Sequence, residues 1–198
     1  MTTPDPNRAT PVVGFVGPSG VGKTSLVEKL VAELTRRGLS VGAVKHASHG
    51  FLADRPGKDS HRFYESGANA VALISREQIA TFTRAERGMG EEVSLADTLA
   101  ALPAGLDLVL AEGFSWEPIP RVVLVREDEE PAPAHVENGE VLAVVSTAAA
   151  PDDDKPDFPG ALIETLIRLL EARGRSVGSA RHAASGAGCR NAVHESAA

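Results

Sequence analysis

The chain has 198 residues, of which 42% are hydrophobic and 24% charged, and its formal net charge is −7. This size and composition suit one α/β domain with a substantial core, whereas the acidic balance argues against nucleic acid or an anionic membrane surface as the main partner. Because the only cysteine is Cys189, near the end of the chain, the sequence excludes a disulfide framework and a cysteine-based metal site.

The predicted elements alternate between strands and helices. Strands are expected at residues 12–16, 41–45, 70–75, 78–83, 106–112, 121–125 and 141–146. Helices are expected at residues 24–37, 60–66, 94–102 and 159–173. Several strands are apolar nearly throughout, which is typical of a mostly parallel sheet covered by helices on both faces. The strands at 70–75 and 78–83 are joined by two residues and predict an antiparallel hairpin at one edge of this sheet.

The two ends of the chain differ in composition from its middle. Residues 1–10 are polar and contain proline, so we expect a flexible N-terminus without the apolar core of a signal peptide. More than half of residues 174–198 are Gly, Ala or Ser, which predicts a disordered tail because such a segment buries too little surface to offset its chain entropy. The folded domain is therefore expected to span residues 11–173. No apolar run approaches membrane-spanning length, which favours the cytoplasm.

Local signals mark the ends of several elements. Gly38 and Gly174 stand directly after predicted helices, where glycine commonly ends a helix, and Asp157 is placed to cap the last one. Residues 127–133 are acidic and contain proline, which predicts a surface loop.

Residues 17–24 read GPSGVGKT and match G-x-x-x-x-G-K-[ST] without a mismatch. They lie between a predicted strand and a predicted helix, which is the context of a phosphate-binding loop (P-loop). There, backbone N–H groups and the helix N-terminus attract phosphate, Lys23 reaches the β- and γ-phosphates, and the Thr24 hydroxyl can bind Mg²⁺. The sequence thus predicts a P-loop NTPase fold that binds a nucleoside di- or triphosphate. The nucleotide-binding residues are expected to be Ser19, Gly20, Val21, Gly22, Lys23, Thr24 and Ser25.

A second group of polar residues follows the predicted strand at 41–45. Ligands of parallel sheets bind outside the carboxyl ends of the strands, so Lys45, His46 and His49 are expected to face the bound phosphates. The alternative is a solvated loop with two incidental histidines. Two histidines three residues apart, without a clear third ligand, do not predict a zinc site.

The third group is the apolar segment that ends in Glu112 and Gly113. It resembles a Walker B segment, in which an acid at the end of a buried strand holds Mg²⁺. Glu112 replaces the commoner Asp, and its longer side chain suits a contact through water. Asp107 stands at the start of the same strand, on the wrong side of the sheet for this role. Elsewhere, Asp59 and Ser60 begin a predicted helix, and one interpretation of them is a helix N-cap.

These groups occur together in a characteristic order. After the P-loop come KHASH at 45–49, DRPGKDS at 54–60, GA at 67–68, EGF at 112–114 and PR at 120–121. This order resembles the molybdopterin-guanine dinucleotide biosynthesis protein B (MobB) family over residues 11–173. The Pro-Gly-Lys-Asp-Ser run combined with the Lys-His motif carries most of the specificity.

The resemblance implies a homodimeric protein that binds GTP and Mg²⁺ and has slow intrinsic GTPase activity. It implies an adaptor that acts beside the guanylyltransferase that joins GMP to molybdopterin, which forms molybdopterin guanine dinucleotide. Lys23, Asp59 and Glu112 are implied as the catalytic residues, with Thr24, Asp59 and Glu112 near Mg²⁺. Lys45 and both histidines of the KHASH segment are implied to face the same cleft and to contact the phosphate of molybdopterin.

The chain departs from the family pattern at two positions. Leu52 stands where the family often has the first Asp of Asp-x-Asp, and Ser115 stands where the family has Lys after Glu-Gly-Phe. If those side chains touch ligand or metal, nucleotide affinity or partner preference differs in this chain.

Two other classes of function stay open. A metallochaperone-type GTPase usually carries a His- or Cys-rich stretch and a guanine-reading [NT]-K-x-D, and neither is present. A small-molecule kinase needs arginines in a lid over the phosphates, for which Arg84 and Arg87 are the only candidates. Without an assignable glutamine or arginine finger, slow hydrolysis is expected. The acidic residues 152–154 are a candidate for reading guanine.

Overall fold

The computed structural model describes residues 10–52, 54–84, 93–147 and 160–173. Its strands are β1 (Val12–Val16), β2 (Val41–Lys45), β3 (Ala70–Ile74), β4 (Ile79–Thr83), β5 (Leu108–Glu112), β6 (Arg121–Arg126) and β7 (Val141–Thr147). Its helices are α1 (Lys23–Arg36), α2 (Asp59–Glu65), α3 (Leu95–Ala100), α4 (Pro133–Val136) and α5 (Gly160–Ala172). Every predicted element is present with ends that differ by at most two residues. Among the described residues, no helix has the length and apolar character needed to cross a membrane.

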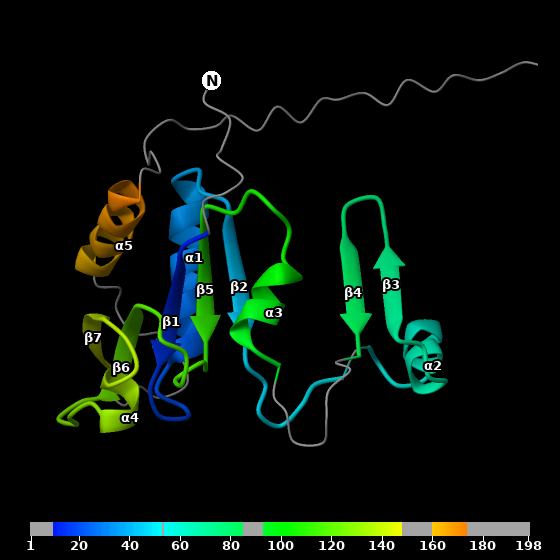
Figure 1. Ribbon diagram of the computed structural model, residues 1–198, viewed down its shortest axis with the longest axis horizontal. Coiled ribbons are helices and arrows are strands. Elements are labelled where there is room, and N and C mark those ends of the chain that lie inside the picture. Colours follow the sequence, from blue (N-terminus) through cyan, green and yellow to red (C-terminus); the bar gives the residue numbers. More distant parts are fainter. Residues whose placement is uncertain (1–9, 53, 85–92, 148–159, 174–198) are drawn as a thin grey trace, which may run out of the picture.

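Five strands form one parallel sheet in the order β2-β5-β1-β6-β7. All five therefore end at the same edge, which lies at the bottom of Figure 1. The loop between β1 and α1 is at this edge, and so are the last residues of β2 and β5. Ligands of open parallel sheets bind in this position, and the topology thus brings the three predicted groups to one end of the molecule.

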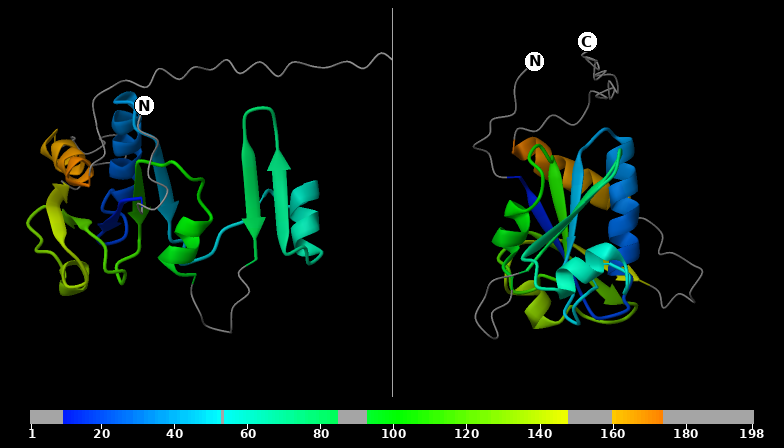
Figure 2. Two further views of the ribbon diagram at one scale, coloured as in Figure 1. Left: turned by 45° about the horizontal axis from the view of Figure 1, so that its top comes forward. Right: turned by 90° about the vertical axis from the view of Figure 1, so that its right-hand side faces the viewer.

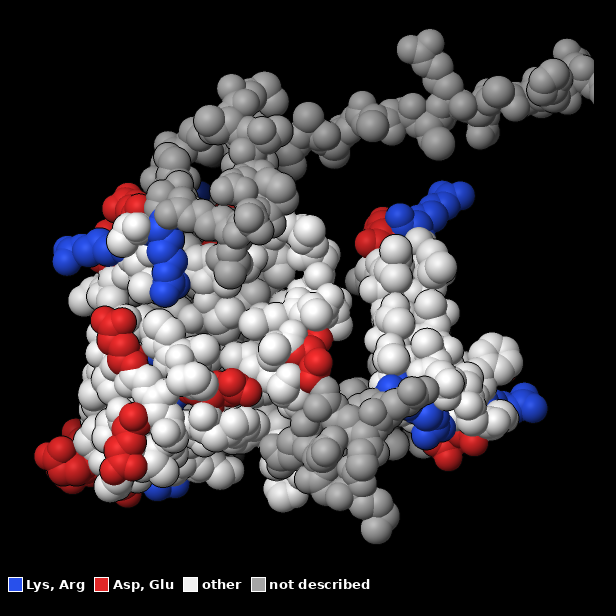
Figure 3. Space-filling model, viewed as in Figure 1, with Lys and Arg blue, Asp and Glu red and all other residues white. Residues whose placement is uncertain are grey.

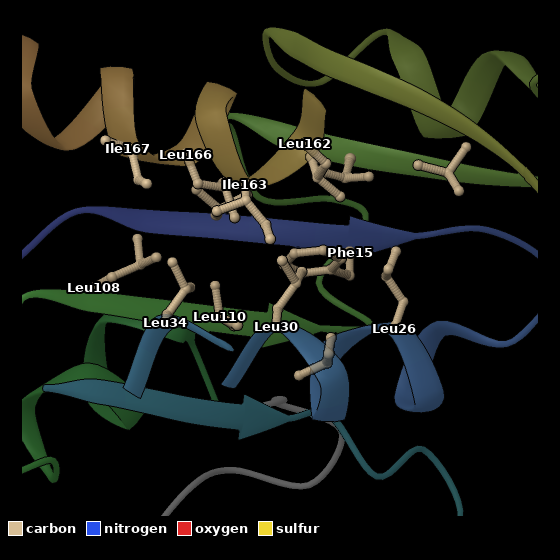
Figure 4. Packing of buried hydrophobic residues seen from close by; sticks show 14 of the residues in the cluster. Phe15, Leu26, Leu30, Leu34, Leu108, Leu110, Leu162, Ile163, Leu166 and Ile167 are labelled. Carbon is tan, nitrogen blue, oxygen red and sulfur yellow. The ribbon is translucent and has the colours of Figure 1, made fainter. Parts of the chain in front are cut away.

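One face of the sheet is covered by α1 and α5. Leu26, Leu30 and Leu34 recur every fourth residue along α1 and are buried, which is the pattern of an amphipathic helix. They pack with Phe15 of β1 and with apolar residues of α5 in the largest core cluster. Figure 4 shows the α1 leucines, Phe15 and the α5 side chains converging on the sheet.

The opposite face is covered by α3 and α4. Leu95 of α3 packs with Val109 and Ala111 of β5, and Val136 of α4 packs with Val123 of β6. The right-hand view of Figure 2 shows α1 and α3 on opposite sides of the sheet. The predicted parallel sheet with helices on both faces is therefore confirmed, and it explains why β5 and β6 are apolar on both sides.

The predicted hairpin is also present, but it forms a sheet of its own. β3 and β4 pair antiparallel from Ala70 opposite Thr83 to Ile74 opposite Ile79, and they join no strand of the five-stranded sheet. Figure 1 shows β3, β4 and α2 standing apart from the main sheet. The sequence pattern predicts pairing within a hairpin, whereas a hairpin's place beside another sheet depends on the path of the long connection before it.

Two local predictions have clear outcomes. The left-handed Gly38, with φ 85°, ends α1. Its N–H bonds to the Thr35 carbonyl at 2.9 Å, and that of Leu39 bonds to the Leu34 carbonyl at 3.1 Å, as in a Schellman motif. The acidic loop ends one residue earlier than expected, because Pro133 occupies the first turn of α4, a position that proline favours. Asp157, Gly174, the predicted tail at 174–198 and residues 1–9 of the predicted flexible N-terminus at 1–10 lie outside the described residues.

Candidate nucleotide-binding site

The loop between β1 and α1 has the backbone that its glycines predict. Gly17, Gly20 and Gly22 all have positive φ, at 147°, 74° and 92°. A Cβ on Gly17 would lie 2.4 Å from the carbonyl oxygen of Leu124 in β6, so only glycine allows this approach. The first turn of α1 contains no acidic residue, which leaves its positive end available to an anion.

Two side chains hold this loop from outside. The buried hydroxyl of Thr147, the last residue of β7, lies 3.0 Å from the Val21 carbonyl oxygen and 3.2 Å from that of Val125. Arg126, the last residue of β6, donates to the Ser19 carbonyl at 3.2 Å. Sequence reasoning missed both, because their partners are backbone carbonyls that no side-chain motif reveals.

Lys23 lies over the loop that precedes it. Its Nζ donates to the carbonyl oxygens of Gly17 at 2.9 Å and Pro18 at 2.6 Å. Burial lowers the pKa of this lysine, nearby Glu112 opposes that shift, and Lys45 adds to it. Lys23 is thus held beside the phosphate-binding backbone, together with a carboxylate and a second ammonium group.

Thr24, Lys45 and Glu112 are in mutual contact. The Thr24 hydroxyl donates to the Glu112 carboxylate at 2.9 Å, and the Lys45 ammonium lies 3.1 Å from both Thr24 Oγ1 and Glu112 Oε1. Glu112 is 9% exposed. The structure thus brings these three residues, from the P-loop, β2 and β5, together.

The donor set here fits Mg²⁺. A hydroxyl and a carboxylate supply oxygen ligands, which this ion prefers, and phosphate and water supply the remainder in nucleotide sites. Among the described residues there is no cluster of three or more His, Cys, Asp or Glu that could hold a metal alone.

His46 and His49 have different surroundings. The His46 ring packs edge-on against Trp116 and Phe114, with centroid distances of 4.9 and 5.8 Å. The backbone N–H of His46 donates to the Glu112 carbonyl at 2.9 Å. It therefore joins the loop after β2 to the loop after β5. His49 lies in an exposed turn and makes no hydrogen bond or ion pair to the P-loop in the described structure.

The structure does not bring Asp59 to Thr24 and Glu112. Asp59 begins α2, which packs against the hairpin, and its side chain is 86% exposed with Arg62 at 4.0 Å. The N-cap of α2 is Lys58 and has no side-chain cap, so the interpretation of Asp59 or Ser60 as the cap is wrong. Ser60 instead bonds to Asp54, which lowers the pKa of that carboxyl group.

Arg121, the arginine of the Pro-Arg pair, is completely buried. Its guanidinium donates to the carbonyl oxygens of Ser115 and Asn138 at 2.9 Å, and also to that of Glu117. Burial lowers its pKa. It connects the segment after Glu112 to the segment before β7, so it supports the site without facing it.

Other sequence candidates lie elsewhere. Asp107 is at the start of β5 and accepts from the Ser40 N–H at 2.9 Å, on the far side of the sheet as expected. Leu52, one of the two departures from the family pattern, is 70% exposed. Ser115, the other, offers its carbonyl to Arg121. Arg84 lies over the Tyr64 ring at 4.1 Å, while Arg87 and residues 152–154 are outside the described residues.

Comparisons with known proteins agree with this geometry. Residues 12–147 match the family described as molybdopterin guanine dinucleotide synthesis protein B. The chain is 38% identical over 122 residues to a molybdopterin-guanine dinucleotide biosynthesis adapter protein of Haemophilus influenzae, which covers 62% of this chain and 67% of that protein. It is 36% identical over 138 residues to the Escherichia coli protein of the same name, which covers 69% of this chain and 78% of that protein.

Solved structures of the same family resemble this fold. A crystal structure of molybdopterin-guanine biosynthesis protein B superposes with a TM-score of 0.60 at 30% identity, over 81% of this chain and 99% of that one. A MobB homologue from Bacillus stearothermophilus superposes with a TM-score of 0.57 at 31% identity, over 81% of this chain and 98% of that one. With the P-loop, the Thr24–Glu112 pair and the matched family spanning most of the folded domain, the chain belongs to the molybdopterin-guanine dinucleotide synthesis protein B family.

Proposed function

We propose that this protein is a GTP-binding adaptor in the biosynthesis of molybdopterin guanine dinucleotide. In this role it assists the guanylyltransferase that attaches GMP to molybdopterin, in the cytoplasm. The observation that carries the proposal is the meeting of the P-loop with the Thr24–Glu112 pair at one sheet edge. The names of its relatives, which are adapter proteins of this pathway, supply the biological context.

The residues divide the work of binding. Backbone N–H groups of the loop and of the first turn of α1 are suited to the phosphates, and Lys23 supplies a positive charge beside them. Thr24 and Glu112 would hold Mg²⁺, which neutralises phosphate charge when bound. A role for Asp59 in the same site, and for Lys45, His46 and His49 in binding the molybdopterin phosphate, stays a prediction.

Slow hydrolysis accompanies this proposal. Within the described residues the contacts of the site provide no glutamine aimed at an attacking water. Arg126, which lies against the loop, is engaged with the Ser19 carbonyl and with Glu129. An arginine finger is worth roughly 10³–10⁵ in rate, so we expect turnover to be slow without a partner.

Calorimetric titration with GTP and with ATP, each with and without Mg²⁺, tests the proposal. Tighter binding of GTP supports the adaptor, whereas preference for ATP contradicts it. Lys23→Ala is expected to reduce GTP affinity by at least about tenfold, since it removes the charge beside the phosphates. Its circular dichroism spectrum should match the wild type, and unchanged affinity in a folded variant would rule out the P-loop assignment.

The adaptor role needs its own measurement. Purified guanylyltransferase should form molybdopterin guanine dinucleotide faster when this protein and GTP are present. The Lys23→Ala variant should give no acceleration. Equal rates with the wild type, the variant and no added protein would restrict the function to nucleotide binding alone.

The kinase alternative receives no support from Arg84. Its guanidinium lies over the Tyr64 ring and donates to the Ala68 carbonyl at 3.2 Å, which fixes α2 to the hairpin rather than forming a lid. For the metallochaperone alternative, the described residues contain no cluster of metal-binding side chains. Neither alternative is therefore favoured by a specific contact.

We also propose that the protein is a homodimer that pairs through the hairpin. Ile74, Ile79 and Phe63 are 76%, 74% and 61% exposed. A two-stranded hairpin is marginally stable by itself, so β3 and β4 need further packing. On the face that Figure 3 shows, the hairpin and α2 carry charged side chains only near their two ends, which suits a second copy of the same apolar surface.

Analytical ultracentrifugation tests the dimer. The wild type is expected to sediment as a dimer, and the double variant Ile74→Asp, Ile79→Asp as a monomer, because each charge would be buried in the interface. Phe51→Asp, in an exposed loop outside the hairpin, is the matched control and should stay dimeric. A monomeric wild type, or a dimeric double variant, would contradict this surface.

A further inference from the structure

The Lys45 ammonium occupies a position among the groups suited to Mg²⁺. It lies 3.1 Å from Thr24 Oγ1 and 3.1 Å from Glu112 Oε1, and these two groups are themselves 3.0 Å apart. A cation of the chain itself therefore lies against both the hydroxyl and the carboxylate that the site offers to a metal.

The fold determines this position. Lys45 and Glu112 are the last residues of β2 and β5 and stand directly opposite each other in the parallel register. The backbone next to them is closely packed, since a Cβ on Gly113 would lie 3.3 Å from the His46 Cβ. Lys23 directs its own ammonium to the carbonyls of Gly17 and Pro18, whereas the Lys45 ammonium lies within hydrogen-bonding distance of Glu112.

We propose that Lys45 competes with Mg²⁺ for Thr24 and Glu112, so that the site admits the metal together with a nucleotide and disfavours the bare ion. The inference rests on the proposed nucleotide-binding function. A Mg²⁺ bound to these two oxygens would lie next to the Lys45 ammonium, and like charges at such a short separation repel. The phosphates of a bound nucleotide supply the negative charge that lets the metal displace the lysine.

The lysine also has a role when the metal is absent. Its charge helps neutralise phosphate that binds without Mg²⁺, so the loss of Lys45 should weaken metal-free binding. The same loss should strengthen metal-dependent binding, because Glu112 is then available. These opposite effects distinguish a competitor from a residue that merely positions Glu112, whose loss would weaken the effect of Mg²⁺.

The experiment compares the dissociation constant of GTPγS in EDTA with that in saturating Mg²⁺, measured by calorimetry on the full chain. The dissociation constant in EDTA divided by that in Mg²⁺ should rise by about three- to tenfold in Lys45→Met, which keeps most of the length of the side chain and removes its charge. Lys45→Arg should keep the wild-type ratio to within about twofold, because it retains the cation. Arg168→Ala, which removes an exposed cation on α5, is the control for net charge and should leave the ratio unchanged.

Glu112→Gln provides a second test. If competition acts through this carboxylate, adding Lys45→Met to Glu112→Gln should no longer strengthen binding in Mg²⁺, although it should still weaken binding in EDTA. An unchanged or lower ratio in the folded Lys45→Met variant would overturn the inference, even though GTPγS still binds. No binding of GTPγS to the wild type would instead overturn the proposed function, so the two failures are distinguishable.

Discussion

The buried arginine of β6 gives the sharpest test of how the site is supported. Arg121 is 0% exposed, and its guanidinium donates to the carbonyl oxygens of Ser115, Glu117 and Asn138. The perturbation is Arg121→Met, which keeps much of the apolar stem and removes the charge and all the donors. It leaves these carbonyl groups, which lie in a partly buried place, without their partner.

Two opposing effects set the size of the change. Hydrogen bonds from a charged donor contribute about 1.5–3 kcal/mol each, so three of them amount to roughly 4–9 kcal/mol. Burial of the unpaired charge in the wild type costs several kcal/mol, which the methionine variant recovers. Because the guanidinium is so well supplied with acceptors, we expect the hydrogen bonds to dominate, with a net loss of about 2–4 kcal/mol in the free energy of unfolding.

Urea unfolding followed by circular dichroism measures this loss. Arg126→Met is the matched control, since Arg126 ends the same strand with a side chain that is 46% exposed. This variant should lose at most about 1 kcal/mol in the free energy of unfolding. Arg121→Lys should not recover the wild-type stability, because one ammonium cannot reproduce the fork of donors. If Arg121→Met were as stable as the wild type or more so, the cost of burying the charge would outweigh its hydrogen bonds and the reasoning would be refuted.

Two further predictions concern the P-loop anchor and the outer face of α1. Thr147→Val removes the hydroxyl next to the Val21 carbonyl. It should lower the free energy of unfolding by about 1–2 kcal/mol, measured by urea unfolding, and weaken GTP binding, measured by calorimetry. Unchanged GTP affinity would show that this anchor is not needed for binding. Hydrogen bonds from Arg36 and Arg37 lower the pKa of Glu33 from 4.5 to about 2, so its stabilising contribution is full above pH 4.5 and is lost as the pH falls toward 2. Glu33→Gln should flatten the stability-against-pH curve in that window, and an identical slope in variant and wild type would contradict this pairing.

The elements were largely predictable because their signals are local. The leucines of α1 repeat with helical spacing, and Gly38 ends the helix with the positive φ that glycine tolerates. β5 is apolar at nearly every position because both of its faces are covered. By contrast, the separate position of the β3–β4 hairpin was not predictable, since no residue of the hairpin records which surface lies beside it.

The supporting residues of the site were the least predictable. Arg121 and Thr147 contact backbone carbonyl oxygens. Every residue offers the same carbonyl group, whatever its side chain is. A motif can therefore indicate that such a residue matters without indicating what it contacts. Asp59 illustrates the reverse case, because a motif placed it near the metal whereas α2 carries it to the hairpin.

Lys45 shows where sequence and structure each contribute. The sequence places Lys45 and Glu112 at the ends of two predicted strands. It indicates that each faces the phosphates, as two independent contacts. The register of β2 with β5 makes them neighbours, and Thr24 of α1 completes the group. Since the pairing joins residues 67 positions apart in the numbering, no local pattern could reveal it. Once the lysine and the carboxylate are neighbours, each changes what the other can bind, and nucleotide and metal affinity must be measured together to separate them.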